Sequence, residues 1–306
     1  MNERFQCSLA SIDRHESLAG TASVVRAWLL IEVRGAWGPR AIHDSELGDY
    51  VPPGWKDQLS QAGIRAICIR ADHRRGSSDV RLFHVVCNRP GAGPDVATTT
   101  TVGSLADVLA ATAGMTNRAA PPTWQPFDGR LVLVCTNGRH DQCCANLGRP
   151  VVRALRESRY ADELWECSHI GGDRFAGNVV VLPDGLYFGR CQADTITGLL
   201  DGHAAGRLDL DHFRGRSSYA PAEQMVEHFV RHRFGLRGAK DVIVGRHDGS
   251  VFRVRTPSGL FDVEIERRMA AQYEPLTCKG PAEQDIAQFE LVSITPLDAV
   301  DAGARS

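Results

Sequence analysis

The feature that most constrains the fold is an unbroken run of apolar residues at 131–134, with no alternating polar positions. A run of this kind is typical of a strand that is buried on both faces of a sheet. The elements expected after it are a helix, a short strand, a hairpin and two helices, at 147–156, 164–167, 178–189, 195–204 and 221–233. This order predicts an α/β domain over residues 128–235, in which helices cover the sheet.

The first 120 residues have a similar order of expected elements. We expect strands at 27–33, 65–70 and 81–88, and helices at 52–62 and 101–112. This similarity predicts two related α/β halves, over 1–120 and 128–235, joined by a proline-rich linker at 118–127. Residues 240–297 form a small β unit in this interpretation, with strands at 242–244, 251–254 and 261–265, and the tail 298–306 is expected to be disordered.

Composition excludes several classes of function. The 306 residues carry a formal net charge of −2, so no overall field favours nucleic acid or an anionic membrane surface, and we expect neither partner. The apolar stretches are strand-sized, and the first residues show no secretory signal, so a cytoplasmic location is expected. The nine cysteines are therefore not expected to form a disulfide framework.

Two segments rich in cysteine, histidine and glycine directly follow two of the expected strands. The first begins at Cys135 and ends at the adjacent pair Cys143 and Cys144, and the second contains Cys167 and His169. Loops that follow parallel strands gather at one edge of a sheet, where ligand sites form. Thiolates and an imidazole at that edge are suitable ligands for a soft or borderline metal centre.

Glycines in both segments reduce side-chain bulk next to these ligands. Gly138 lies in the first segment, and Gly171 and Gly172 lie in the second. They would allow backbone N–H groups to approach a bound cofactor and donate hydrogen bonds to it. We therefore count these glycines as cofactor-contacting residues, together with Arg174, a member of an expected basic rim for a docking partner.

The two segments together resemble the signature of the sucrase/ferredoxin-like family, which is similar to thioredoxin-like ferredoxins. The matching positions are Cys135-Thr136-Asn137-Gly138, Asp141, Cys144, and the run from His169 to Asn178. The resemblance implies a thioredoxin-like ferredoxin domain. Together with the order of elements, we expect an α/β fold in which the related half and the small β unit lie beside this domain. It also implies a [2Fe–2S] cluster with mixed cysteine and histidine ligands.

The resemblance implies a ligand set that this sequence only partly reproduces. The family's cysteine spacing matches Cys135 and Cys144, and its first histidine matches His169. The second histidine falls on Asp173, whose hard oxygen suits an iron–sulfur cluster less well. Cys167 lies two residues before His169, so both side chains would share a strand face, and our hypothesis takes it as the fourth ligand. Asp173 and Cys143 remain alternatives.

The function favoured by these residues is electron transfer, coupled to proton transfer if a histidine binds iron, with a reductase or acceptor protein as redox partner. One alternative is a structural zinc site that uses the same residues. Another is a thiol oxidoreductase, although the chain lacks a Cys-x-x-Cys helix start. A hydrolase is disfavoured because no pair of opposed carboxylates marks a sugar site.

Overall fold

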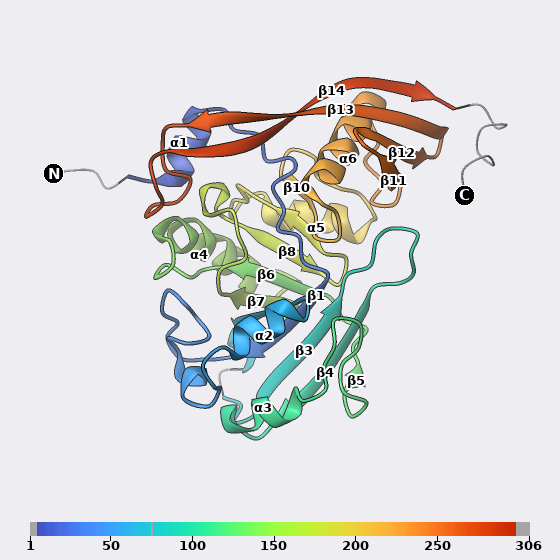
Figure 1. The fold of residues 1–306 in the computed structure, drawn as a ribbon. Helices are drawn as coiled ribbons and strands as arrows, with labels where there is room; N and C mark the ends of the chain where they lie inside the picture. Colours follow the sequence, from blue (N-terminus) through green and yellow to red (C-terminus); the bar gives the residue numbers. More distant parts are fainter. Residues whose placement is uncertain (1–4, 75, 298–306) are drawn as a thin grey trace.

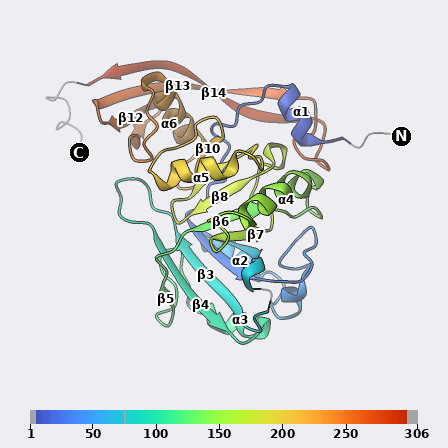
Figure 2. The same cartoon turned by 180° about the vertical axis from the view of Figure 1, so that it is seen from behind.

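The computed structural model describes residues 5–74 and 76–297. Its largest element is a mixed sheet of ten strands (Figures 1 and 2). From one edge to the other its strands are β10 (Phe213–Arg216), β9 (Leu186–Phe188), β8 (Val179–Leu182), β6 (Leu131–Cys135), β7 (Leu164–Cys167), β2 (Ile64–Arg70), β1 (Ala27–Glu32), β3 (Val80–Val86), β4 (Val96–Val102) and β5 (Gln125–Pro126).

The two halves of this sheet repeat one topology. In the first half, β1 pairs parallel with β2 and antiparallel with β3, which pairs antiparallel with β4. In the second half, β6 pairs parallel with β7 and antiparallel with β8, which pairs antiparallel with β9. The halves meet where β2 pairs antiparallel with β7, at Ile69 and Cys167. The fold is therefore α/β with two related halves in one sheet, while the domain boundaries drawn from the sequence stay predictions.

Six α-helices and four short 3-10 turns lie in the described part of the chain. The helices are α1 (Cys7–Asp13), α2 (Trp55–Gln61), α3 (Val108–Ala111), α4 (Gln142–Arg156), α5 (Ile196–Ala204) and α6 (Pro221–Phe234), with 3-10 turns at Glu46–Asp49, Asp72–Arg74, Leu105–Asp107 and Asp173–Phe175. Strand β6 is buried along its whole length, and its side chains alternate between two cores. Leu133 and Cys135 face one core, and Val132 and Val134 face the core under α4.

Three expectations of secondary structure in the region of the ten-stranded sheet were wrong. The helix expected at 101–112 is the end of β4 followed by a 3-10 turn and the short α3, because the β-branched threonines 98–101 pair with β3. The linker expected at 118–127 contains β5, which pairs with β4. Helix α4 begins five residues earlier than expected, because the carboxylate of Asp141 accepts the N–H of Cys143 and caps the helix.

A second sheet of four antiparallel strands follows α6. Its strands are β11 (Ile243–Asp248), β12 (Val251–Thr256), β13 (Gly259–Gln272) and β14 (Gln284–Pro296). The small β unit is thus present, but β13 is much longer than expected and β14 was not expected. Beyond the sheet, β13 and β14 continue as a hairpin arm that crosses the molecule from α6 to α1 (Figures 1 and 2). The expected disordered tail, 298–306, lies outside the described residues.

Among the residues that the structure describes, no helix has both the length and the apolar character needed to cross a membrane.

Candidate functional site

Two of the predicted ligands stand side by side at the ends of neighbouring strands. Cys135 is the last residue of β6, Cys167 is the last residue of β7, and the two are partners in the parallel register. Their side chains point to the same face of the sheet and enter the same core, where both residues are at most 1% exposed. The strand register, which the sequence does not show, thus brings these two thiols together.

The third thiol, Cys144, comes from the first turn of α4. Its Sγ lies 3.1 Å from Oδ1 of Asp173, and the residue is 1% exposed. One turn along, a Cβ on Gly148 would lie 2.2 Å from the carbonyl oxygen of Cys135, so only glycine allows α4 to approach the end of β6 this closely. The neighbouring thiols of Cys144 and Cys167 lower the pKa of Cys135, and Cys135 in turn raises the pKa of Cys144.

A histidine and a carboxylate continue this group toward solvent. Nδ1 of His169 lies 2.9 Å from Oδ1 of Asp173, and the ring of His140 stands 3.9 Å from that of His169. The Asp173 side chain is 2% exposed, whereas that of His169 is 29% exposed. Burial raises the pKa of Asp173, but the contacts with His169, Cys144 and His140 together outweigh burial, so the pKa lies below its usual value.

We name the five residues Cys135, Cys144, Cys167, His169 and Asp173 the strand-end cluster. Its donor atoms form a continuous series from the buried thiols to the part-exposed imidazole, through the contact between Cys144 and Asp173. The four ligands of the sequence hypothesis are all members of this series. Their assignment as ligands stays a prediction.

The predicted cofactor-contacting glycines lie in tightly packed loops. Gly171 and Gly172 adopt φ angles of +98° and +78°, which side chains disfavour, and a Cβ on Gly172 would lie 2.2 Å from Nη2 of Arg214. A Cβ on Gly138 would lie 2.7 Å from that of Ala145. Each glycine is therefore needed for packing, whether or not its N–H group also meets a cofactor.

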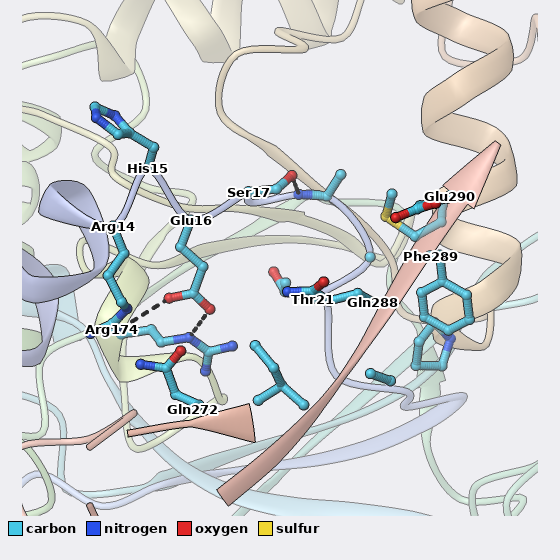
Figure 3. Close-up of a pocket in the computed structure, with 16 residues that line it drawn as sticks. Arg14, His15, Glu16, Ser17, Thr21, Arg174, Gln272, Gln288, Phe289 and Glu290 are labelled. Atoms are coloured by element: carbon cyan, nitrogen blue, oxygen red, sulfur yellow. Dashed lines mark hydrogen bonds and ion pairs between the residues drawn. The ribbon is translucent and has the colours of Figure 1, made fainter. Parts of the chain in front are cut away.

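Arg174 is engaged by the N-terminal segment. Its Nε lies 2.6 Å from Oε1 of Glu16, and its guanidinium group stands 4.4 Å from the centre of the Phe175 ring. Figure 3 shows the pair on the wall of a cavity of about 790 Å³ between residues 14–21 and the β13–β14 arm. The basic rim expected from the sequence is thus partly occupied by contacts within the chain.

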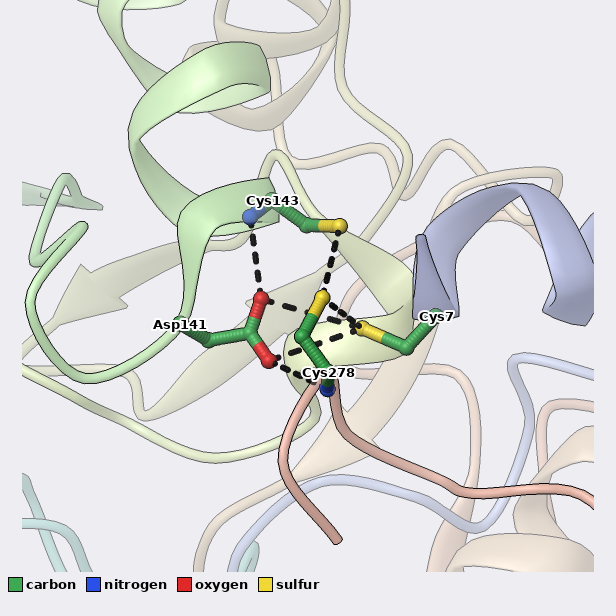
Figure 4. A group of neighbouring side chains, drawn as sticks. All are labelled: Cys7, Asp141, Cys143 and Cys278. Carbon is green, nitrogen blue, oxygen red and sulfur yellow. Dashed lines mark hydrogen bonds between the residues drawn. The ribbon is translucent and has the colours of Figure 1, made fainter. Parts of the chain in front are cut away.

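A second group of sulfur atoms was missed by the sequence reasoning. Cys7 is the first residue of α1, Cys143 is the second residue of α4, and Cys278 lies in the tip of the arm. The Sγ of Cys278 is nevertheless 3.5 Å from that of Cys143 and 3.6 Å from that of Cys7 (Figure 4). Asp141 lies beside them, and the ligand atoms of all four residues are within 4.8 Å of one another. We name these four residues the three-cysteine cluster.

The adjacent residues Cys143 and Cys144 therefore belong to different clusters: Cys143 to the three-cysteine cluster and Cys144 to the strand-end cluster. Cys143 faces Cys7 and Cys278, and Cys144 faces Cys135 and Asp173. The sequence did contain cysteines without an assigned role, including Cys7 and Cys278. Because more than 130 residues separate each of them from Cys143, no local pattern indicated that the three meet. All nine cysteines lie in the described part of the chain, and each is a free thiol there.

Comparison with known proteins gives three kinds of similarity: to a curated relative, to solved structures and to a family model. One curated relative, the Altered inheritance of mitochondria protein 32 of Eremothecium gossypii, is 31% identical over 117 residues, which are 33% of this chain and 37% of that protein. Crystal structures of the thioredoxin-like [2Fe–2S] ferredoxin from Aquifex aeolicus also match. A variant covers 29% of this chain and 100% of its own at 21% identity, and another structure covers 29% and 94% at 19%, both with a TM-score of 0.27.

A family model described as sucrase/ferredoxin-like matches residues 18–215. This match includes both segments that carry the strand-end cluster, and it covers well over half of the chain. The chain therefore belongs to the sucrase/ferredoxin-like family.

Proposed function

We propose that this protein carries electrons on a [2Fe–2S] cluster held by Cys135, Cys144, Cys167 and His169. The observation that carries the proposal is the convergence of three buried thiols with an imidazole at one end of the sheet. These donors fit the group, because thiolates bind iron–sulfur clusters and an imidazole can replace a thiolate on one iron. When bound, such a cluster accepts and releases one electron at a time.

The chain's own residues prepare the site in two ways. A cysteine binds metal as the thiolate, and the neighbouring thiols already lower the pKa of Cys135. Burial of the three thiols excludes water from the sulfur side, while the part-exposed His169 is the point at which a redox partner can approach. A reductase or acceptor protein at this edge is part of the proposal, as is exchange of a proton with solvent at His169.

Asp173 is a positioning residue in this proposal. One of its oxygens contacts both the thiol of Cys144 and Nδ1 of His169, so it fixes the imidazole relative to the thiol. Cys167 is preferred as the fourth ligand, because sulfur suits a sulfide-bridged cluster better than a carboxylate oxygen does. Cys167 also stands beside Cys135 in the parallel register of β6 and β7.

The test is anaerobic purification of the full chain, with assays for iron and acid-labile sulfide and an EPR spectrum after reduction. We expect a brown protein with equal amounts of iron and sulfide. Cys144→Ser should lose most of the iron, while Cys191→Ser, a buried cysteine in another core, should keep it. A colourless protein that contains zinc instead of iron would refute the proposal and favour the zinc alternative.

Two further variants distinguish the fourth ligand. Cys167→Ser should lose or alter the cluster spectrum, whereas Asp173→Asn should keep the cluster and shift its potential. If the spectrum is unchanged in Cys167→Ser and lost in Asp173→Asn, aspartate is the ligand. The thiol oxidoreductase alternative would require thiol–disulfide exchange activity, and the adjacent Cys143 and Cys144 face different groups.

A further inference from the structure

The three-cysteine cluster unites parts of the chain that are far apart in sequence. Cys7 comes from α1, Cys143 from α4, and Cys278 from the arm tip, and both Cys7 and Cys278 lie outside the region that the family model matches. Cys7 is 0% exposed and Cys143 is 1% exposed, whereas Cys278 is only partly buried. The cluster is thus enclosed by protein on one side and reachable from solvent at the arm.

Asp141 completes the group as a buried carboxylate without a cation. The residue is 1% exposed, and in the described part of the chain no arginine, lysine or histidine pairs with it. Its two oxygens accept the backbone N–H groups of Cys143 at 2.9 Å and Cys278 at 2.8 Å. These bonds orient the carboxylate and leave lone pairs on both oxygens, which a metal ion could use.

The distances match a tetrahedral metal site. Zinc–sulfur bonds of about 2.3 Å at tetrahedral angles place two sulfur ligands about 3.8 Å apart. The observed Sγ–Sγ distances are 3.5 and 3.6 Å, and the Sγ of Cys7 lies 3.7 Å from the nearer oxygen of Asp141. Only small movements are needed to place the four donors around one ion.

We propose that Cys7, Asp141, Cys143 and Cys278 bind a structural zinc ion, separate from the iron–sulfur cluster. Three thiolates and one carboxylate are ligands that zinc accepts, and a set of four protein ligands leaves no open position for catalysis. Binding releases the thiol protons, and the cation compensates the negative charges that would otherwise repel one another. Copper(I) would favour the thiolates but not the hard carboxylate oxygen.

The consequence of zinc binding is attachment of the hairpin arm. Around Cys278, the tip already makes an ion pair between Glu274 and Arg14 at 2.5 Å and a hydrogen bond from Lys279 to the carbonyl of Arg139 at 3.2 Å. Side-chain pairs with exposed partners contribute little by themselves. A metal ion shared by α1, the start of α4 and the arm tip would hold these three segments together, next to the loop that joins Cys135 on β6 to Cys144 on α4.

The test measures zinc and iron in the same samples of the full chain after incubation with zinc chloride and removal of excess metal. We expect about one zinc per chain in the wild type and in Cys144→Ser, although the latter loses iron. Cys278→Ser should bind zinc at least tenfold more weakly in competition with a chromophoric chelator while keeping its iron. Cys191→Ser is the matched control, because its thiol lies in a different core and should leave both metals unchanged.

A second measurement does not depend on metal analysis. Trypsin should cleave after Lys279 more slowly in the zinc-loaded protein than in protein treated with a chelator, and zinc should give no protection to Cys278→Ser. Zinc retained by Cys278→Ser with wild-type affinity overturns the proposal, as does a wild-type chain that binds no zinc. If Cys278→Ser loses iron and Cys144→Ser does not, the iron–sulfur ligands belong here, and both proposals fail together. A Cys143–Cys278 disulfide in the protein purified under reducing conditions also overturns this proposal.

Discussion

Replacement of Gly148 by alanine should destabilise the protein, although the same change normally stabilises a helix. A methyl group on Gly148 would lie 2.2 Å from the carbonyl oxygen of Cys135, whereas ordinary contacts of this kind begin at 3.4 Å. The oxygen belongs to the end of the buried strand β6 and has little freedom to move. Helix α4 must therefore withdraw from β6 by about 1.2 Å, and Cys144 moves away from Cys135 with it.

The expected magnitude follows from two opposing effects. Alanine in place of glycine inside a helix contributes about 0.5–1 kcal/mol of stability, and overpacking of a rigid core costs about 1–3 kcal/mol. We expect a net loss of about 1–2 kcal/mol from the free energy of unfolding, which corresponds to a fall in Tm of several degrees. Gly198 in α5 provides the control, because a Cβ there meets nothing within 4 Å, and Gly198→Ala should raise stability by about 0.5–1 kcal/mol.

Urea unfolding of both variants, followed by far-UV circular dichroism, measures these two changes with opposite signs. Iron content of the same samples tests the link to the site, since the altered spacing of Cys135 and Cys144 should lower cluster occupancy in Gly148→Ala only. Equal stabilisation of the two variants would refute the reasoning. It would mean that α4 yields without cost at the point of closest approach.

Two further predictions concern α6. Glu227 accepts hydrogen bonds from Arg216 and Arg231 through one oxygen in a buried site. Glu227→Ala should therefore lower the free energy of unfolding, measured in urea, by about 3–5 kcal/mol, and the isosteric Glu227→Gln should lower it less. Equal, small effects of the two variants would contradict this. Burial, and then the charge of His232, lowers the pKa of His228 to about 4 from the usual 6.5. Between these two pH values the unfolded chain binds a proton that the folded chain does not bind, so about 2–3 kcal/mol of stability present above pH 6.5 is lost as pH falls toward 4. His228→Phe should remove this dependence of stability on pH. A normal pKa for His228 in the folded protein, measured by NMR, would contradict the prediction.

Much of the strand-end cluster could be inferred from local patterns. The apolar run at 131–134 determines a buried strand whatever surrounds it, because its side chains have no polar face to turn to water. Loops after parallel strands meet at one sheet edge, so Cys135 and the segment after Cys167 were expected near one another, and the register bears this out. The contact between His169 and Asp173 could also be inferred locally, because the two residues are only four positions apart in the sequence.

Other features depended on contacts that no local pattern contains. The threonines of β4 form a strand because β3 offers a partner, and the long arm exists because β13 and β14 pair with each other along their length. The three-cysteine cluster depends on where that arm ends, since Cys278 meets Cys7 across 271 positions of the chain. Side-chain chemistry and periodicity are local properties and can be read along the sequence. The meeting of distant segments is decided by packing of the whole chain, and here it alone brought the three thiols together.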